Sequence, residues 1–333
     1  MPEGYAARVV FVSGHRFGVE ALSGLMESEA FSRGSLNIAA VLCQHPMHAY
    51  SVVGYSDLYT FSCERSLNAR CFHSLSSAPV GKFLSQTRHD YLLVVGLSQL
   101  VPPAILDLPK NFNHARSRHS ESYGCIGMHP TILPVGRGRA PIPWSIIKSL
   151  HNSGVTAFLL EEEADSGGII DQEFFQIDDL DHAGDVFEKV ARCHRRIGQR
   201  LAEMLGNRAL IAEPQMQCNA TYWGRRQPRD GWLDFNLKSK ELLRLIRACH
   251  SPYPGAFFVA GDAIFIVQDA CEQDRKANIS PGTILELNCD GSYAISTSDS
   301  AIRILKCSSG NMACLRVGQR IMSPNQISID DEA

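Results

Sequence analysis

A histidine and an aspartate lie on two stretches of chain whose backbone is restricted by glycine and proline. His129 stands in the segment 127–141, which holds three prolines and three glycines, and Asp165 follows thirty-six residues later, just before Gly167 and Gly168. A histidine can take up a proton, and a carboxylate beside it can orient the ring and stabilise its charged form. The two residues therefore predict a site of proton transfer.

Together the two segments resemble the signature of the formyltetrahydrofolate-dependent formyltransferases. That family's usual pattern is Asn-x-His-x-Ser-Leu-Leu-Pro, then Arg-Gly-x-Ala-Pro, then a strand and Asp-x-Gly. This chain has His129, Leu133-Pro134, the sequence Arg-Gly-Arg-Ala-Pro at 137–141 and Asp165, and it has Gly127 where the family has its catalytic asparagine. The resemblance implies an enzyme that transfers a formyl group to an amine through a tetrahedral intermediate.

The resemblance also implies a role for each residue of the site. His129 would contact the formyl oxygen and take part in proton movement, and Asp165 would hold the imidazole or a relay water. The family's asparagine amide helps to bind the formyl oxygen, and one such donor typically contributes a factor of roughly 100 to 1000 in rate. Gly127 has no side chain to offer, so position 127 is where this chain departs most from the family.

Two explanations of Gly127 are open. The segment 107–123 is longer than the family usually has, and it would fold back to deliver Asn111, Asn113 or His114 in place of the missing amide. Alternatively, the site is repurposed, and the one-carbon transfer is lost or altered. The same segment is also typical of a solvated polar loop without a role in the site.

By the same resemblance, 10-formyltetrahydrofolate is the formyl donor. The backbone after the fourth predicted strand would contact the pterin edge, and the loop before Asp165 would form the other side of the pocket. The donor-binding candidates are Gly96, Leu97, Ser98, Gln99 and Leu100 on the first segment and Glu162, Glu163 and Ala164 on the second. The successive glutamates are equally typical of a charged surface.

Arg137 and Arg139 are candidates for contacting the acceptor or for compensating the loss at Gly127. No metal is expected, because the eleven cysteines include no C-x-x-C pair and no convincing pairing with histidine at zinc spacing. We expect reduced thiols that mostly pack in the core.

The first half alternates β-branched runs with amphipathic stretches, which predicts an α/β fold with a parallel, Rossmann-like sheet covered by helices. A strand pair should flank Asp165, and a long amphipathic helix should follow it. The expected strands are 7–13, 36–42, 91–95, 125–128, 155–161 and 168–177, and the expected helices are 17–28, 80–86, 140–149 and 184–205.

After a polar linker, the second half of the chain shows a different pattern of residues. A helix over 239–248 precedes five short strands separated by turn residues, which predicts a small, OB-like β-barrel. The expected strands are 256–259, 263–268, 283–287, 293–297 and 302–307. The motifs at 230–235, 253–257 and 281–283 resemble the C-terminal domain of methionyl-tRNA and aminoarabinose formyltransferases. We therefore expect a catalytic domain over 1–205, a linker over 206–227 and a barrel domain over 228–325.

Charge favours a small acceptor over a nucleic acid. The 333-residue chain has a formal net charge of −3, residues 228–320 hold eleven Lys and Arg against ten Asp and Glu, and the loop 44–59 holds no Lys or Arg. We expect the acceptor to be a small-molecule amine, on an amino sugar nucleotide or derived from an amino acid.

The beginning of the chain has no basic and apolar leader, and no segment approaches about 20 apolar residues, so we expect a cytoplasmic protein without membrane contact. The oligomeric state is open, a homodimer included. The alternatives to the small-amine reading are a repurposed enzyme that hydrolyses the formyl donor or rearranges a non-folate substrate, a methionyl-tRNA formyltransferase, and a non-catalytic binding protein.

Overall fold

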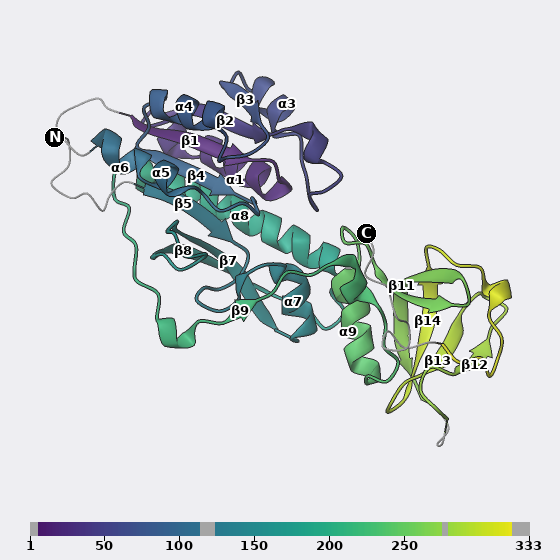
Figure 1. Cartoon of the computed structure of the whole chain (residues 1–333). Helices are drawn as coiled ribbons and strands as arrows, with labels where there is room; N and C mark the ends of the chain where they lie inside the picture. The colour runs from purple at the N-terminus through teal and green to yellow at the C-terminus, as the bar shows by residue number, and fades with distance from the viewer. Residues whose placement is uncertain (1–5, 114–123, 275–278, 322–333) are drawn as a thin grey trace. The chain divides into compact units, whose positions relative to one another are not determined.

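The computed structural model describes residues 6–113, 124–274 and 279–321 of the chain (Figure 1). The chain forms two compact units that interleave along the sequence. The first comprises Met1–Pro141, Asn152–Gln176 and Phe187–Gly224, and the second comprises Ile142–His151, Ile177–Val186 and Arg225–Ala333.

A seven-stranded sheet in the order β3-β2-β1-β4-β5-β7-β8 forms the centre of the first unit. Strands β1 to β5 run parallel, whereas β7 pairs antiparallel with both β5 and β8. The predicted Rossmann-like α/β fold is confirmed, but the short β3 was not predicted. The strands are β1 (Ala7–Ser13), β2 (Leu36–Gln44), β3 (Ala69–Phe72), β4 (Tyr91–Val95), β5 (Gly124–His129), β7 (Asn152–Leu159) and β8 (Ile169–Gln176).

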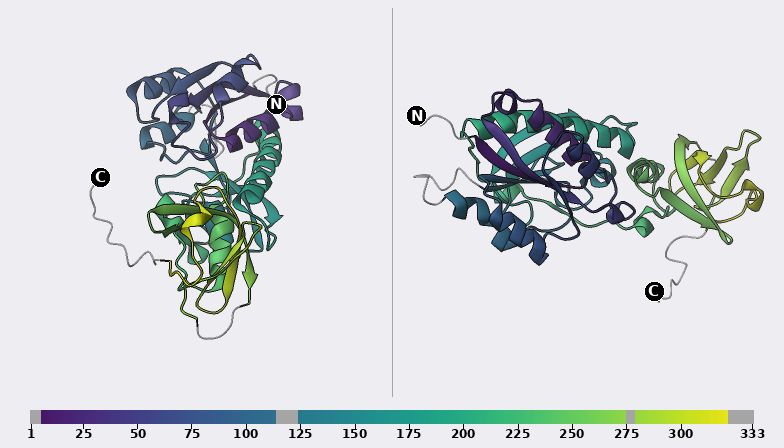
Figure 2. Two further views of the ribbon diagram at one scale, coloured as in Figure 1. Left: turned by 90° about the vertical axis from the view of Figure 1, so that its right-hand side faces the viewer. Right: turned by 90° about the horizontal axis from the view of Figure 1, so that it is seen from above.

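Helices cover both faces of this sheet (Figure 2), with α1 and the long α8 on one side and the blue helices on the other. On the α1–α8 side, the rings of Phe17 and His194 stack with centroids 4.7 Å apart. On the other side, α4 and α5 pack Leu84 and Ile105 against the strands. The helices are α1 (Arg16–Met26), α2 (Glu29–Ser32), α3 (Leu58–Cys63), α4 (Ala78–Gln86), α5 (Pro103–Leu106), α6 (Leu108–Asn113), α7 (Pro141–Ile147) and α8 (Ala183–Gly206), with 3-10 turns η1 (Pro46–His48) and η3 (Gln217–Asn219).

The second unit is built on a five-stranded antiparallel sheet in the order β10-β11-β14-β13-β12. Phe258 and Phe265 stack in its core with ring centroids 4.9 Å apart, and Tyr293 meets both rings edge-on. The small β-domain that the sequence predicts is confirmed as an antiparallel half-barrel. Its elements are η4 (Pro228–Gly231), α9 (Ser239–Cys249), β10 (Ala256–Ala260), β11 (Ala263–Gln273), β12 (Ile284–Leu287), β13 (Tyr293–Ser296), β14 (Ala301–Cys307) and η5 (Met312–Cys314).

Among the helices of the described residues, none combines the length and the apolar character needed to cross a membrane.

Candidate active site

His129 is the last residue of β5, a strand buried along its whole length. Its Nε2 lies 2.8 Å from the carbonyl oxygen of Gly136, and its Nδ1 lies 3.7 Å from Oδ2 of Asp165. Because a carbonyl oxygen only accepts hydrogen bonds, Nε2 carries the ring proton and Nδ1 of the neutral ring has a free lone pair. The ring can therefore accept a proton at Nδ1, and the resulting imidazolium would face a carboxylate.

Asp165 is held on a turn that few residues adopt. Its φ is +56°, in the left-handed region that costs a non-glycine residue about 1–2 kcal/mol. Its Oδ2 accepts a hydrogen bond of 2.8 Å from the backbone N–H of Gly138. The Nε2 of Gln215 donates to the carbonyl oxygens of Asp165 at 2.9 Å and Gly167 at 2.7 Å. The turn is thus fixed from both the side chain and the backbone.

Arg137 lies completely inside the protein. Its guanidinium donates to Oε1 of Gln215 at 2.7 Å, to Oε1 of Gln217 at 2.9 Å and to the hydroxyl of Tyr222 at 2.9 Å. Tyr222 in turn donates to Oε1 of Glu163 at 3.0 Å. The sequence suggested acceptor contact for Arg137. Its side chain is buried, and its hydrogen bonds join the loops around Asp165.

The segment predicted as a linker supplies a strand to this site. The two-residue strands β6 (Arg137–Gly138) and β9 (Tyr222–Trp223) pair in parallel. Gly136, with φ of +77°, lies so close to the indole of Trp223 that a Cβ at position 136 would sit 2.7 Å from the ring. A glycine is therefore required where the carbonyl of residue 136 reaches His129. Sequence reasoning missed β9, Trp223 and Gln215, because two-residue strands and lone glutamines have no periodic signal.

Gly127 faces an occupied space. A Cβ at this position would lie 2.6 Å from Cδ2 of Leu160 and 3.2 Å from Cε1 of Phe158. An asparagine here would require Leu160 to move, since contacts below 3 Å are not tolerated in packed interiors. The side chain of Leu160 thus occupies the space next to position 127.

The three proposed substitutes for that amide are only partly described. Asn111 and Asn113 end α6, where the sequence was also compatible with a loop, and their side chains are not described. His114 lies outside the described residues. Sequence reasoning passed over Thr131, whose hydroxyl is buried two residues after His129 and has no hydrogen-bond partner in the described part of the chain.

The donor-binding candidates lie on two segments. Gly96 to Leu100 follow the carboxyl end of β4, where Gly96 has a φ of +67° and packs against His15. The carbonyl of Ser98 accepts a 3.3 Å hydrogen bond from Nη2 of Arg139, which ties this segment to the loop after His129. Gln99 accepts from the backbone N–H of Leu75, and Leu100 is largely exposed.

Glu162 and Glu163 line a cavity of about 460 Å3 in the first unit. Pro103, Leu106 and Leu160 form part of its apolar wall. Ala164 is exposed at the end of the same loop. Leu160 therefore lines the cavity and also fills the space beside Gly127.

Two family models match this chain over most of its length. The family model "Formyl transferase" matches residues 8–198, and "Formyl transferase, C-terminal domain" matches residues 226–317. Methionyl-tRNA formyltransferase of Clostridium tetani (strain Massachusetts / E88) is 27% identical over 225 residues, which is 68% of each chain.

Two solved structures share the fold. WlaRD, a sugar 3N-formyl transferase crystallised with dTDP and 5-N-formyl-THF, has a TM-score of 0.61 at 16% identity over 92% of this chain and 99% of its own. HypX of Aquifex aeolicus in complex with tetrahydrofolic acid has a TM-score of 0.57 at 17% identity over 92% of this chain, which spans 45% of the length of HypX. Because the models of both domains of the formyl transferase family match this chain, the chain belongs to that family, whose members are enzymes that transfer formyl groups.

Proposed function

We propose that the protein transfers a formyl group from 10-formyltetrahydrofolate to an amine of a small metabolite, either an amino sugar nucleotide or an amine derived from an amino acid. The observation that carries the proposal is the position of Nδ1 of His129, which is free to take a proton 3.7 Å from the carboxylate of Asp165. An amine that attacks a formyl carbon must lose a proton, and a positioned histidine supplies the base.

The residues of the site divide the work. Nδ1 of His129 accepts the proton of the attacking amine and passes it to the folate nitrogen as the bond from that nitrogen to the formyl carbon breaks. Nε2 keeps its hydrogen bond to Gly136 and holds the ring in place. Asp165 stabilises the imidazolium that forms, because an opposite charge within about 4–6 Å favours the charged ring. Gln215 and Arg137 keep the turn of Asp165 in position.

The cavity lined by Glu162 and Glu163 is suited to the folate that donates the formyl group. Its apolar wall fits a flat heterocycle, and the carboxylates fit the N–H donors of a pterin. WlaRD and HypX, which share the fold, were crystallised with folates. When bound, the folate supplies the formyl carbon that the amine attacks.

The charge of the chain supports a small acceptor over tRNA. A tRNA-binding surface gains its affinity from clustered lysines and arginines, and the loop 44–59 contains neither. That loop also exposes Met47 and Tyr50, whose side chains are 66% and 103% exposed. An apolar and aromatic surface of this kind suits a metabolite better than a phosphate backbone.

A second candidate follows from Leu160. Since this side chain fills the space of the family's amide, the site would instead run an altered reaction, such as hydrolysis of the formyl donor with water in place of the amine. The same proton acceptor serves either reaction.

The test is turnover of 10-formyltetrahydrofolate by the full chain, with product formyl groups traced from labelled donor. The proposal expects label in a panel of amino sugar nucleotides or amino-acid-derived amines and none in methionyl-tRNA. Label released as formate at an amine-independent rate would establish the second candidate. The absence of any turnover, together with no stabilisation by 5-formyltetrahydrofolate in a melting assay, would refute both.

A further inference from the structure

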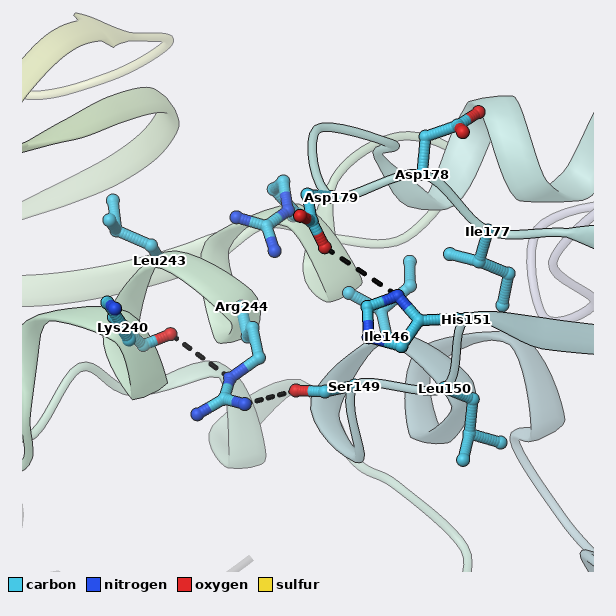
Figure 3. Close-up of a pocket in the computed structure, with 11 residues that line it drawn as sticks. Ile146, Ser149, Leu150, His151, Ile177, Asp178, Asp179, Lys240, Leu243 and Arg244 are labelled. Carbon is cyan, nitrogen blue, oxygen red and sulfur yellow. Dashed lines mark hydrogen bonds and ion pairs between the residues drawn. The ribbon is translucent and has the colours of Figure 1, made fainter.

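A second cavity lies entirely within the second unit, apart from the residues proposed for formyl transfer. Its volume is about 370 Å3, within the range of small-ligand sites. Figure 3 shows Lys240, Leu243 and Arg244 on α9 along one side, with Ser149 and His151 across from them. Ile146 and Leu243 give it an apolar lining.

Helix α9 concentrates positive charge on this cavity. Lys240, Arg244 and Arg247 all line it and stand four and three residues apart, so they share one face of the helix. Like charges at these spacings repel one another and destabilise an isolated helix. An anion in the cavity would remove that cost.

Arg247 has a buried hydrogen-bond donor, its Nε, without a partner among the described residues. Burial lowers the pKa of this guanidinium below its ordinary value, and the neighbouring Arg244 lowers it further, against weaker opposing effects of Asp179 and Asp181. Arg247 lines the cavity, and an anion there would offset the cost of burying its positive charge.

Arg244 is held at the wall of the cavity. Its Nε donates to the carbonyl of Lys240 at 3.2 Å, and its Nη1 donates to the hydroxyl of Ser149 (Figure 3). These two bonds orient the guanidinium and leave Nη2 for a ligand. Two carboxylates, Asp178 and Asp179, also line the cavity, and Asp179 lies 3.8 Å from Nδ1 of His151.

We propose that this cavity binds a small oxyanion, the phosphate or carboxylate group of a metabolite, between Arg244 and Arg247, with Lys240 at the entrance. Guanidinium groups bind such oxygens in pairs of hydrogen bonds, and both Arg244 and Arg247 line the cavity. The apolar lining receives the carbon skeleton of the ligand. The site is independent of the proposed formyl transfer, since it shares no residue with it.

The test is equilibrium dialysis of the full chain with radiolabelled inorganic phosphate at constant ionic strength, with citrate as competitor. We expect one saturable site per chain. Arg247→Gln should weaken binding by at least about 10-fold, the value of one charge-assisted hydrogen bond, and Lys240→Gln should weaken it by a smaller factor. Arg316→Gln is the matched control, since Arg316 is an exposed arginine of the same unit that does not line the cavity.

Competition by citrate distinguishes the source of the oxyanion. Displacement of phosphate by equimolar citrate identifies a carboxylate ligand, and the lack of displacement identifies a phosphate ligand. Equal binding by wild type, Arg247→Gln and Lys240→Gln would overturn the proposal, and so would a wild type that binds neither anion. Because Lys240 is exposed, its variant keeps the test valid if Arg247→Gln fails to fold.

Discussion

The two ring nitrogens of His129 have different partners and therefore different roles in the proposed reaction. Nε2 is committed to the carbonyl of Gly136, so only Nδ1 remains for proton transfer, and Asp165 faces that nitrogen. The carboxylate contributes its charge, while its bond from the N–H of Gly138 contributes position. A substitution of Asp165 by asparagine separates the two contributions, because asparagine has the same shape and an oxygen that can accept the hydrogen bond from Gly138 but carries no charge.

Asp165→Asn should lower kcat on the order of 100-fold and change KM little, because the imidazolium loses its countercharge only when the proton has been transferred. The measurement is steady-state formyl transfer, with circular dichroism as the check on folding. A KM that rises with kcat unchanged would instead place Asp165 in substrate binding.

Gly127→Asn should destabilise the protein by about 1–3 kcal/mol, since its Cβ would meet Leu160 at 2.6 Å. It should not raise the rate by itself. The double variant Gly127→Asn with Leu160→Ala opens the space for the amide, and transfer should rise by up to roughly the 100-fold of one oxyanion donor. Urea denaturation and initial rates measure both effects, with Leu160→Ala alone as control. A fully stable Gly127→Asn variant with a raised rate would show that Leu160 does not obstruct the site.

At the scale of elements, the short pairing of β6 with β9 and the contacts of Gln215 hold together segments that lie far apart in sequence. Gln215 donates to both carbonyls of the Asp165 turn and accepts from buried Arg137, whereas Gln217 contacts only the guanidinium. The two glutamines therefore form a matched pair for testing the positioning role.

Gln215→Ala should reduce kcat by about 10-fold or more and the free energy of unfolding by about 1–3 kcal/mol, because two carbonyls and a buried guanidinium lose a partner. Gln217 is exposed, so Gln217→Ala should reduce both kcat and the free energy of unfolding by less than Gln215→Ala does. Kinetics and chemical denaturation of both variants provide the comparison. Equal kinetics in the two variants would mean that the Asp165 turn does not need Gln215.

The α1–α8 face buries two histidines in neutral form. Burial lowers the pKa of His15 to about 4 and that of His194 to about 3, from 6.5 in the unfolded chain. Between these values the unfolded chain binds protons that the folded chain does not, so stability is complete above pH 6.5 and decreases as the pH falls.

These two histidines should therefore lower the free energy of unfolding by up to about 2.7 kcal/mol per pH unit as the pH falls well below 6.5, up to about 1.4 kcal/mol from each. His194→Leu should reduce the slope between pH 6.5 and 5 by up to about 1.4 kcal/mol per pH unit, the contribution of one histidine. Urea denaturation across that range measures it. An unchanged slope in the variant would show that His194 is already protonated in the folded protein.

Most elements could be predicted because their signals are local. Strands β1 and β4 are continuous apolar runs, and their bounds agree with the prediction, as does the antiparallel pair β7 and β8 around Asp165. Strand β3 was missed because its sequence, Ala-Arg-Cys-Phe, has mostly exposed side chains and no clear alternation.

The parts of the site that the sequence did not indicate arise from tertiary contacts. The contact of Leu160 with position 127, the burial of Arg137 and the indole over Gly136 depend on pairings between segments tens of residues apart. Residue type alone made Arg137 a plausible ligand for an acceptor, whereas its surroundings make it a brace. The motif thus predicted that His129 and Asp165 act together, and the structure brings them within 3.7 Å of each other, whereas the contacts around them depend on the fold.

At the scale of the whole molecule, the two units are interleaved in sequence. The segments 142–151 and 177–186 come before and after the strands around Asp165, yet both belong to the second unit. The cavity proposed for an oxyanion is built from these two segments and α9. Both proposed sites therefore depend on the intact chain, and functional tests should use it.

Whether His129 takes the proton of the attacking amine is tested most directly by measuring formyl transfer by His129→Gln and by wild type under single-turnover conditions. Glutamine keeps an N–H group that can donate to the carbonyl of Gly136 but provides no base, so the fold and the donor affinity should persist. We expect the transfer rate to fall by at least about 100-fold. Transfer by His129→Gln at the wild-type rate would contradict the claim that this histidine takes the proton of the attacking amine.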